Sequence, residues 1–229
     1  FRSMGLVSKN TGHGDKVSVS DHYCLVKIEI NTIMRGTLLK PVDIQVCPAL
    51  QAIIPGTGYS IPVLDRDELY ASKLVAALDR QHPRDLFDVM HLFRQGGFTK
   101  QMLDCFVIYL ICHNRPMHEV LASHNLPLER LFHNSFVGMT EENISLDDLK
   151  TVRDKLKKDL IVSLGVEQKQ FLLSFAAANP DWSLTPFSNV SLMPGVQWKL
   201  RNLLVLKKRN IQKYDEQLQA LDAVFQHSL

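Results

Sequence analysis

Residues 65–93 constrain the fold of this chain more than any other stretch, because two short helical patterns meet there at a single break. Leucines and other apolar residues recur at the spacing of three and four that places them on one buried helix face. The break contains Pro83, and proline is well accepted in the first turn of a helix. The pattern therefore predicts two helices, over 66–80 and 84–95, that are joined by a tight turn.

The polar residues of these two helices cluster, whereas an ordinary solvated face would scatter them. Lys73 and Arg80 are seven residues apart, so they share one stripe of the first helix. Arg84, Asp85 and Asp88 follow the break at helical separations of three and four residues. Cations and carboxylates that border an apolar core suit a site that holds phosphate.

The spacing K-x3-AL-x-R-x3-RD-x2-D, which runs from Lys73 to Asp88, resembles the AbiEii/AbiGii group of nucleotidyltransferase toxins in the DNA polymerase β-like nucleotidyltransferase superfamily. The sequence VKIEIN at 26–31 is similar to a core strand of that family. The resemblance implies transfer of an NMP from an NTP to an acceptor such as tRNA, with Mg²⁺ as cofactor. It also implies a cytoplasmic bacterial toxin with a cognate antitoxin, of the toxin–antitoxin or abortive-infection type.

The chain departs from the family pattern at its start. The family's opening motif, a Gly-Ser followed by Asp-x-Asp, is expected before VKIEIN, and none of the 25 residues before Val26 supply it. We therefore predict a truncated chain that lacks the first strands and metal-binding aspartates and is inactive as it stands. Asp65 and Asp67 come after VKIEIN, and Asp65 with Glu68 is typical of a helix start, so they do not replace the missing motif.

The resemblance also implies roles for individual residues. Glu29, in the middle of VKIEIN, would be the one remaining metal ligand of an incomplete Mg²⁺ site. Lys73 and Asp85 would join it as catalytic residues, with the ammonium offsetting charge on the leaving pyrophosphate. The residues that would hold and orient the nucleotide are Lys73, Arg80, Arg84 and Asp88.

Each of these residues also has a structural interpretation. Lys73 could be a surface lysine whose stem covers apolar neighbours. The charges around the break could form an ion-pair lattice that ties two helix ends together, and Asp85 could cap the second helix. Glu29 could lie on the solvent-facing side of an edge strand. The whole chain could then be a non-catalytic nucleotide- or partner-binding module, either a degenerate toxin or a fragment.

The predicted fold is α+β, a partial nucleotidyltransferase sheet followed by a large, mainly helical region. We expect a loose lead-in over 1–20, then strands over 22–34 and 42–46 and an extended segment at 61–64. A glycine-containing loop near residue 140 would separate a nucleotidyltransferase-like domain, 1–140, from a helical C-terminal region, 141–229. The helices expected after the first two cover 99–113, 115–122, 127–136, 146–163, 167–177, 190–207 and 211–227.

Composition and motif content exclude several other classes. The formal net charge is only +2, so no global basic field indicates nucleic acid. The basic stretch 187–209, which contains Trp198, is either a helix end suited to its dipole or an RNA-facing patch. P-loop, dinucleotide-binding and nucleophile-elbow motifs and zinc-ligand spacings do not occur. No apolar run is long enough for a membrane helix, and Cys105 and Cys112 fit buried thiols of a reducing compartment.

Overall fold

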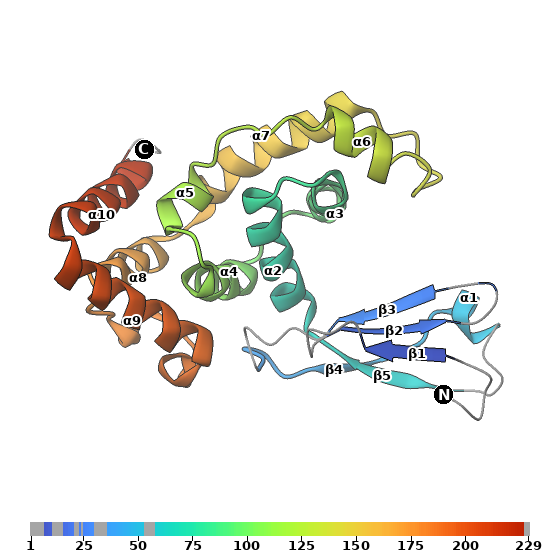
Figure 1. Ribbon diagram of the computed structural model, residues 1–229, viewed down its shortest axis with the longest axis horizontal. Helices are drawn as coiled ribbons and strands as arrows, with labels where there is room; N and C mark the ends of the chain where they lie inside the picture. Colours follow the sequence, from blue (N-terminus) through green and yellow to red (C-terminus); the bar gives the residue numbers. More distant parts are fainter. Residues whose placement is uncertain are drawn as a thin grey trace. The chain divides into compact units, whose positions relative to one another are not determined.

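The computed structural model of the chain describes residues 7–10, 16–20, 23, 25–29, 36–52 and 58–226. Its contacts divide the chain into two compact units, residues 1–36 and 37–229. The first unit contributes three strands, and the second is mainly helical with a two-stranded sheet (Figure 1). The fold class is therefore α+β, as the sequence predicts.

The first unit is an antiparallel meander of β1 (Val7–Asn10), β2 (Lys16–Ser20) and β3 (Leu25–Glu29), in that order across the sheet. The expectation of a loose lead-in over 1–20 is wrong for residues 7–10 and 16–20, which form strands. Two valines of β2 alternate with serines and face Val26 and Ile28 of β3 in the register. This alternation is too short and too polar to indicate a strand by itself, and pairing with both neighbours satisfies its backbone groups.

The second unit begins with a hairpin of β4 (Val42–Gln45) and β5 (Ser60–Val63), with the short helix α1 (Pro48–Gln51) between them. The first was expected as a strand over 42–46 and the second only as an extended segment at 61–64, and the two pair antiparallel with Ile44 opposite Ile61. These two isoleucines are about half exposed. A two-stranded ribbon is only marginally stable alone, so this hairpin needs an anchor on the helices that follow.

Helices α2 (Arg66–Asp79), α3 (Pro83–Arg94) and α4 (Lys100–Cys112) agree closely with the predicted ranges. The central helix is α4, which packs against α2, α5, α8 and α9 and is buried along most of its length. Its cysteines Cys105 and Cys112 are buried, as predicted, and loss of solvent raises the pKa of each thiol to about 12.

The remaining helices complete this unit. The longest described helix, α7, starts after Ser145, whose side chain and that of Asp148 form a capping box. It packs against α2 and α3, so helices on both sides of residue 140 share one unit, and the domain division at 140 stays a prediction. The helices are α5 (Met117–Leu121), α6 (Glu129–Ser135), α7 (Leu146–Ser163), α8 (Val166–Ala176), α9 (Pro194–Arg209) and α10 (Ile211–Gln226), with 3-10 turns at Trp182–Leu184 and Val190–Leu192.

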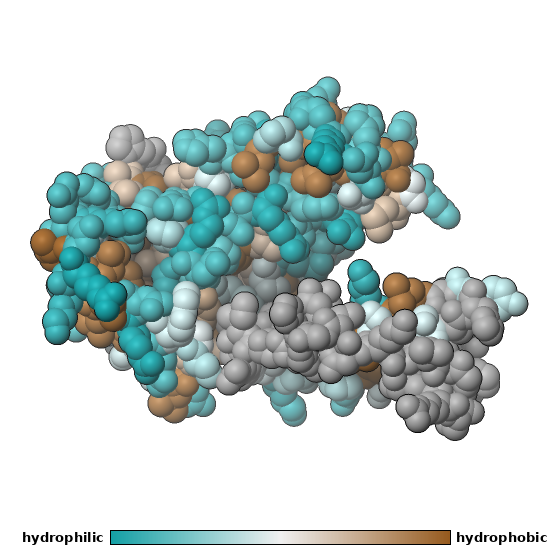
Figure 2. Space-filling view, viewed as in Figure 1, coloured by the Kyte–Doolittle hydropathy of each residue, from teal (hydrophilic) through white to brown (hydrophobic). Residues whose placement is uncertain are grey.

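The visible face of the helical unit is mostly hydrophilic, with small hydrophobic patches between the charged side chains (Figure 2). This distribution is ordinary for a folded protein surface. Among the helices that the structure describes, none combines the length and the apolar character needed to cross a membrane.

Candidate functional site

The turn between α2 and α3 has a defined backbone path. Arg80 ends α2 with its N–H bonded to the last turn, and Gln81 then takes a left-handed conformation with φ of 49°. His82 caps α3, since its Nδ1 accepts from the N–H of Arg84 at 3.2 Å, and Pro83 occupies the first turn. The turn therefore fixes the orientation of α3 relative to α2, and this orientation decides which charged side chains come into contact.

Lys73 and Asp88 meet across the two helices. The Nζ of Lys73 donates to Oδ2 of Asp88 at 2.5 Å, and the two side chains are 34% and 36% exposed. An ion pair this close to solvent contributes about 0–1 kcal/mol to stability. Lys73 is therefore neither an unpaired surface lysine nor a strong structural tie, and its ammonium can still be reached from solvent.

Arg80 and Asp85 form a second, tighter pair. Nε and Nη2 of Arg80 donate to the two carboxylate oxygens of Asp85 at 2.6 and 2.8 Å. The hydrogen bonding of the guanidinium to this carboxylate is the main reason that the pKa of Arg80 is raised. The Asp85 side chain is 10% exposed and that of Arg80 is 64% exposed. One edge of the guanidinium is thus held by Asp85, and the other edge has no hydrogen-bond partner among the described residues.

Arg84 supplies the unbalanced charge of the cluster. Its side chain is exposed, and within the described part of the chain no carboxylate pairs with it. Asp88, four residues further along the helix, pairs with Lys73. Three cations thus face two carboxylates. Burial, and then the charge of Arg84, lower the pKa of the neighbouring His82.

Glu29 lies at the end of β3, which is an edge strand among the three described strands of its sheet. Its side chain falls outside the described residues, and β3 belongs to the other compact unit. That Glu29 joins Lys73 and Asp85 in one site therefore stays a prediction. Among the described residues, no three His, Cys, Asp or Glu side chains are grouped closely enough to hold a metal ion.

The acids at the start of α2 are engaged in the fold. Asp65 is the N-cap, and its side chain accepts from the N–H of Asp67 at 2.8 Å, as expected for a helix start. The carboxylate of Asp67 in turn accepts from the hydroxyl of Thr99 at 2.6 Å. Both carboxylates therefore have structural partners, which agrees with the view that they do not replace the family's Asp-x-Asp.

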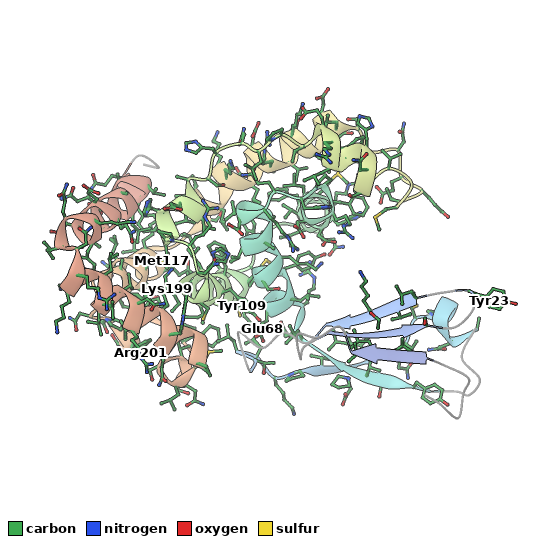
Figure 3. The ribbon with its side chains drawn as sticks, viewed as in Figure 1. Tyr23, Glu68, Tyr109, Met117, Lys199 and Arg201 are labelled. Atoms are coloured by element: carbon green, nitrogen blue, oxygen red, sulfur yellow. The ribbon has the colours of Figure 1, made fainter. Side chains whose placement is uncertain are left out.

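Glu68 was expected to mark the helix start together with Asp65, but the bonds of its carboxylate lead to other parts of the chain. It is fully buried, and its carboxylate accepts from the backbone N–H groups of Leu38 and Leu39 at 2.8 and 2.9 Å. The hydroxyl of Tyr109 donates to it at 3.1 Å (Figure 3). Burial, followed by the charge of Glu68, raises the pKa of Tyr109. Glu68 thus anchors the chain leading into β4 on α2 and α4, through partners too distant in sequence for a local pattern to reveal.

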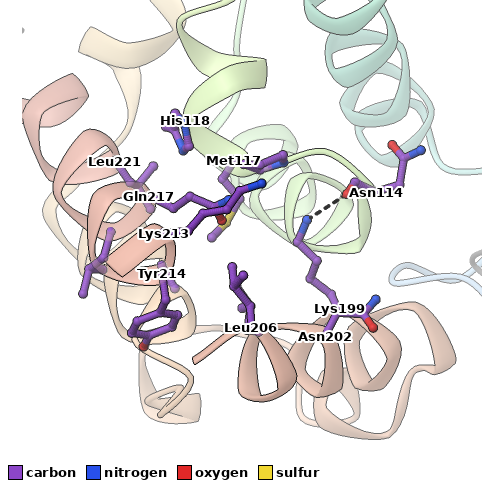
Figure 4. A pocket seen from close by; sticks show the side chains of 14 residues that line it. Asn114, Met117, His118, Lys199, Asn202, Leu206, Lys213, Tyr214, Gln217 and Leu221 are labelled. Carbon is purple, nitrogen blue, oxygen red and sulfur yellow. Dashed lines mark hydrogen bonds between the residues drawn. The ribbon is translucent and has the colours of Figure 1, made fainter. Parts of the chain in front are cut away.

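A second basic cluster lies at α9. The Nζ of Lys199 is buried and donates to the carbonyls of His113, Asn114 and Arg115 at 2.7, 3.4 and 2.6 Å (Figure 4). Burial lowers the pKa of Lys199 to about 8. A cavity of about 250 Å³ lies beside it. Lys199 therefore caps the end of α4 and is removed from the basic surface expected over 187–209, whereas Trp198 is 47% exposed.

Comparison with known families places the chain. A family model described as "Nucleotidyl transferase AbiEii toxin, Type IV TA system" matches residues 6–202. This match spans most of the sequence, and the chain belongs to the AbiEii family of nucleotidyltransferase toxins. The resemblance read from Lys73 to Asp88 is confirmed at the level of the family. Neither the curated proteins nor the solved structures gave a match.

Proposed function

We propose that this chain binds an NTP at the α2–α3 turn, as part of a toxin that transfers an NMP to an acceptor such as tRNA. One observation carries the proposal. Two cations extend from α2 toward carboxylates of α3, and the guanidinium of Arg80 and the side chain of Arg84 remain open to solvent. The family description supplies the reaction class and a cognate antitoxin, and a cytoplasmic location belongs to the same proposal.

The geometry suits phosphate better than it suits a purely structural lattice. Guanidinium groups recognise phosphate oxygens with two parallel hydrogen bonds, and the free edge of Arg80 offers such a fork. Lys73 is only loosely held, so a phosphate could take the place of Asp88 as its partner. In this proposal Asp85 keeps Arg80 oriented, and Asp88 holds the Lys73 ammonium until the nucleotide arrives.

Catalysis by these 229 residues alone is a separate matter. Glu29 is the single residue that the resemblance assigns to Mg²⁺, and the sequence contains no Gly-Ser and Asp-x-Asp ahead of Val26. We therefore propose little or no transfer by this polypeptide. Incubation with labelled NTPs, Mg²⁺ and total tRNA tests this, and robust labelling of RNA would contradict it.

The second candidate, a non-catalytic nucleotide- or partner-binding module, rests on the same ion pairs. It predicts NTP binding without transfer under any added metal, even in a longer polypeptide that carries the Asp-x-Asp motif. Transfer by such a polypeptide, together with its loss in Asp85→Asn, would favour the enzyme.

Calorimetry of NTP binding tests the shared part of both candidates. Replacing Lys73 or Arg84 with alanine removes one charged donor, which should weaken NTP affinity by about tenfold or more. Lys158→Ala is the matched control, because Lys158 is an exposed lysine of α7 without an ion pair in the described part of the chain. Equal affinity in the wild type, Lys73→Ala and Arg84→Ala would overturn the proposed site.

A further inference from the structure

Gln81 stands in the turn between Arg80 and Arg84, the two arginines proposed to contact phosphate, and has an unusual environment for a turn residue. Gln81 is only 1% exposed, and its φ of 49° is in the left-handed region. A residue with a Cβ adopts this conformation at a cost of about 1–2 kcal/mol, so surrounding contacts must hold it. The turn is thus maintained by tertiary interactions, since its own backbone preference opposes it.

The amide of Gln81 supplies those contacts. Its Nε2 donates to the carbonyl of His124 at 2.6 Å and to the hydroxyl of Ser123 at 3.3 Å. Its Oε1 accepts from the N–H of Leu126 at 3.0 Å, with Nη1 of Arg153 at 3.5 Å. Both ends of the amide are therefore occupied by one loop, 122–128, and by α7.

This loop is itself tied to the helices on either side. The hydroxyl of Ser123 donates to the carbonyl of Leu78 in the last turn of α2 at 2.9 Å. From α7, Nη1 of Arg153 donates to the carbonyl of Leu126 at 2.8 Å, and Nζ of Lys157 donates to Asn125 at 2.6 Å. The loop consequently connects the end of α2 to α7 through hydrogen bonds, and Gln81 contributes to these bonds with both ends of its amide.

We infer that Gln81 is a positioning residue for Arg80. By holding the turn in its left-handed path, it sets the direction in which Arg80 leaves α2 and keeps the guanidinium on Asp85 with its outer edge free. The consequence for nucleotide affinity rests on the NTP site proposed above. The consequence for the Arg80–Asp85 pair is independent of that proposal.

Gln81→Gly is the direct test, because glycine accepts a positive φ while the side chain and its amide contacts are removed. Ala178→Gly is the matched control. Ala178 is the other described residue with a side chain at positive φ, 54°, and it lies at the end of α8, away from the turn. The control isolates the backbone effect of adding a glycine at a left-handed position.

Two measurements are needed. The Nε–Hε resonance of Arg80 reports the hydrogen bond to Asp85 without any nucleotide, and it should shift or broaden in Gln81→Gly and stay unchanged in Ala178→Gly. NTP affinity should fall by about tenfold or more in Gln81→Gly only, since a small misplacement of a binding group has a large effect. Retention of both the wild-type resonance and the wild-type affinity in folded Gln81→Gly would overturn the inference.

Ser123→Ala covers the case in which Gln81→Gly does not fold. Ser123 is half-buried on the loop, and its hydroxyl joins the amide of Gln81 to the end of α2. The substitution removes this hydroxyl. It should move the Arg80 resonance in the same direction with a smaller loss of affinity, and an unmoved resonance would contradict the positioning role. If the wild type bound no NTP, the proposed function would be refuted. If the Arg80 resonance nevertheless shifted or broadened in Gln81→Gly, the positioning inference would stand.

Discussion

The α2–α3 turn and the junction of α9 with the end of α4 each place a helical lysine beside oxygen acceptors, yet the two lysines end in opposite states. Lys73 remains about one-third exposed and pairs with a single carboxylate. Lys199 is 5% exposed and donates to three backbone carbonyls. In sequence the two look alike, because each is a lysine among leucines of an amphipathic helix.

The difference teaches that the kind of acceptor decides whether a cation is available to a ligand. A side-chain carboxylate such as Asp88 can turn away, so its lysine can exchange partners. The carbonyls at the end of α4 are part of the backbone and cannot turn away. Lys199 therefore keeps them as its partners and is not available to a ligand. Counting basic residues along the chain would give both clusters the same weight as binding surfaces.

Removing Lys199 should produce the largest change in stability. Lys199→Ala leaves the carbonyls of His113 and Arg115 without their donor and removes the buried stem, so the free energy of unfolding should fall by about 2–3 kcal/mol. Urea denaturation measures the loss, with Lys158→Ala as the control, which should stay within about 0.5 kcal/mol of the wild type. A loss no larger than that of the control would show that water replaces the ammonium at no cost.

The pH dependence of stability should also distinguish Lys199. Its folded pKa of about 8 lies below the ordinary value of 10.5, so the unfolded chain binds more protons between these pH values. The free energy of unfolding should therefore rise with pH across this window, by up to about 2–3 kcal/mol relative to Lys199→Met. Denaturation at pH 7.5 and 10 measures the difference, and a constant gap between wild type and variant would contradict the lowered pKa.

Asp85→Asn should have a moderate effect. The asparagine keeps the shape but loses the bidentate ion pair with Arg80 and the acid in the first turn of α3, which together amount to about 1 kcal/mol. The same substitution should abolish transfer in a longer polypeptide with Asp-x-Asp, on the proposed function. Normal turnover in that polypeptide would reduce Asp85 to a structural role.

Lys73→Ala should have the smallest effect on stability, below about 1 kcal/mol, because its pair with Asp88 is open to solvent. Thermal unfolding of this variant beside Lys199→Ala gives the sharpest form of the comparison. If Lys73→Ala proved as destabilising as Lys199→Ala, the α2–α3 charges would be a structural lattice, and the distinction between the two lysines would fail.

Local patterns predicted most of the helices. The range 146–163 was predicted with both ends correct, because Ser145 and Asp148 carry a complete start signal. The range 190–207 was less accurate, since Pro194 starts α9 only after a short 3-10 turn. The strands β1 and β2 were missed, because their stability comes from pairing with each other and with β3.

The candidate site was predicted as a set of residues but not as a set of contacts. The helical spacing of four residues allowed a pair between Arg84 and Asp88, in the less favoured charge order, whereas Asp88 pairs with Lys73, fifteen residues away. That outcome depends on the angle between α2 and α3, which the left-handed Gln81 sets through partners more than forty residues distant in sequence. Sequence spacing within one helix cannot contain this information.

The anchoring of the β4–β5 hairpin has a consequence for how freely the chain can vary. Glu68 grips residues 38 and 39 by their main-chain N–H groups, so the side chains at these two positions are not part of the recognition. Any residue other than proline can offer the same donor there. The two sides of the contact therefore differ in their tolerance to substitution. Positions 38 and 39 accept many residue types, whereas position 68 requires its carboxylate.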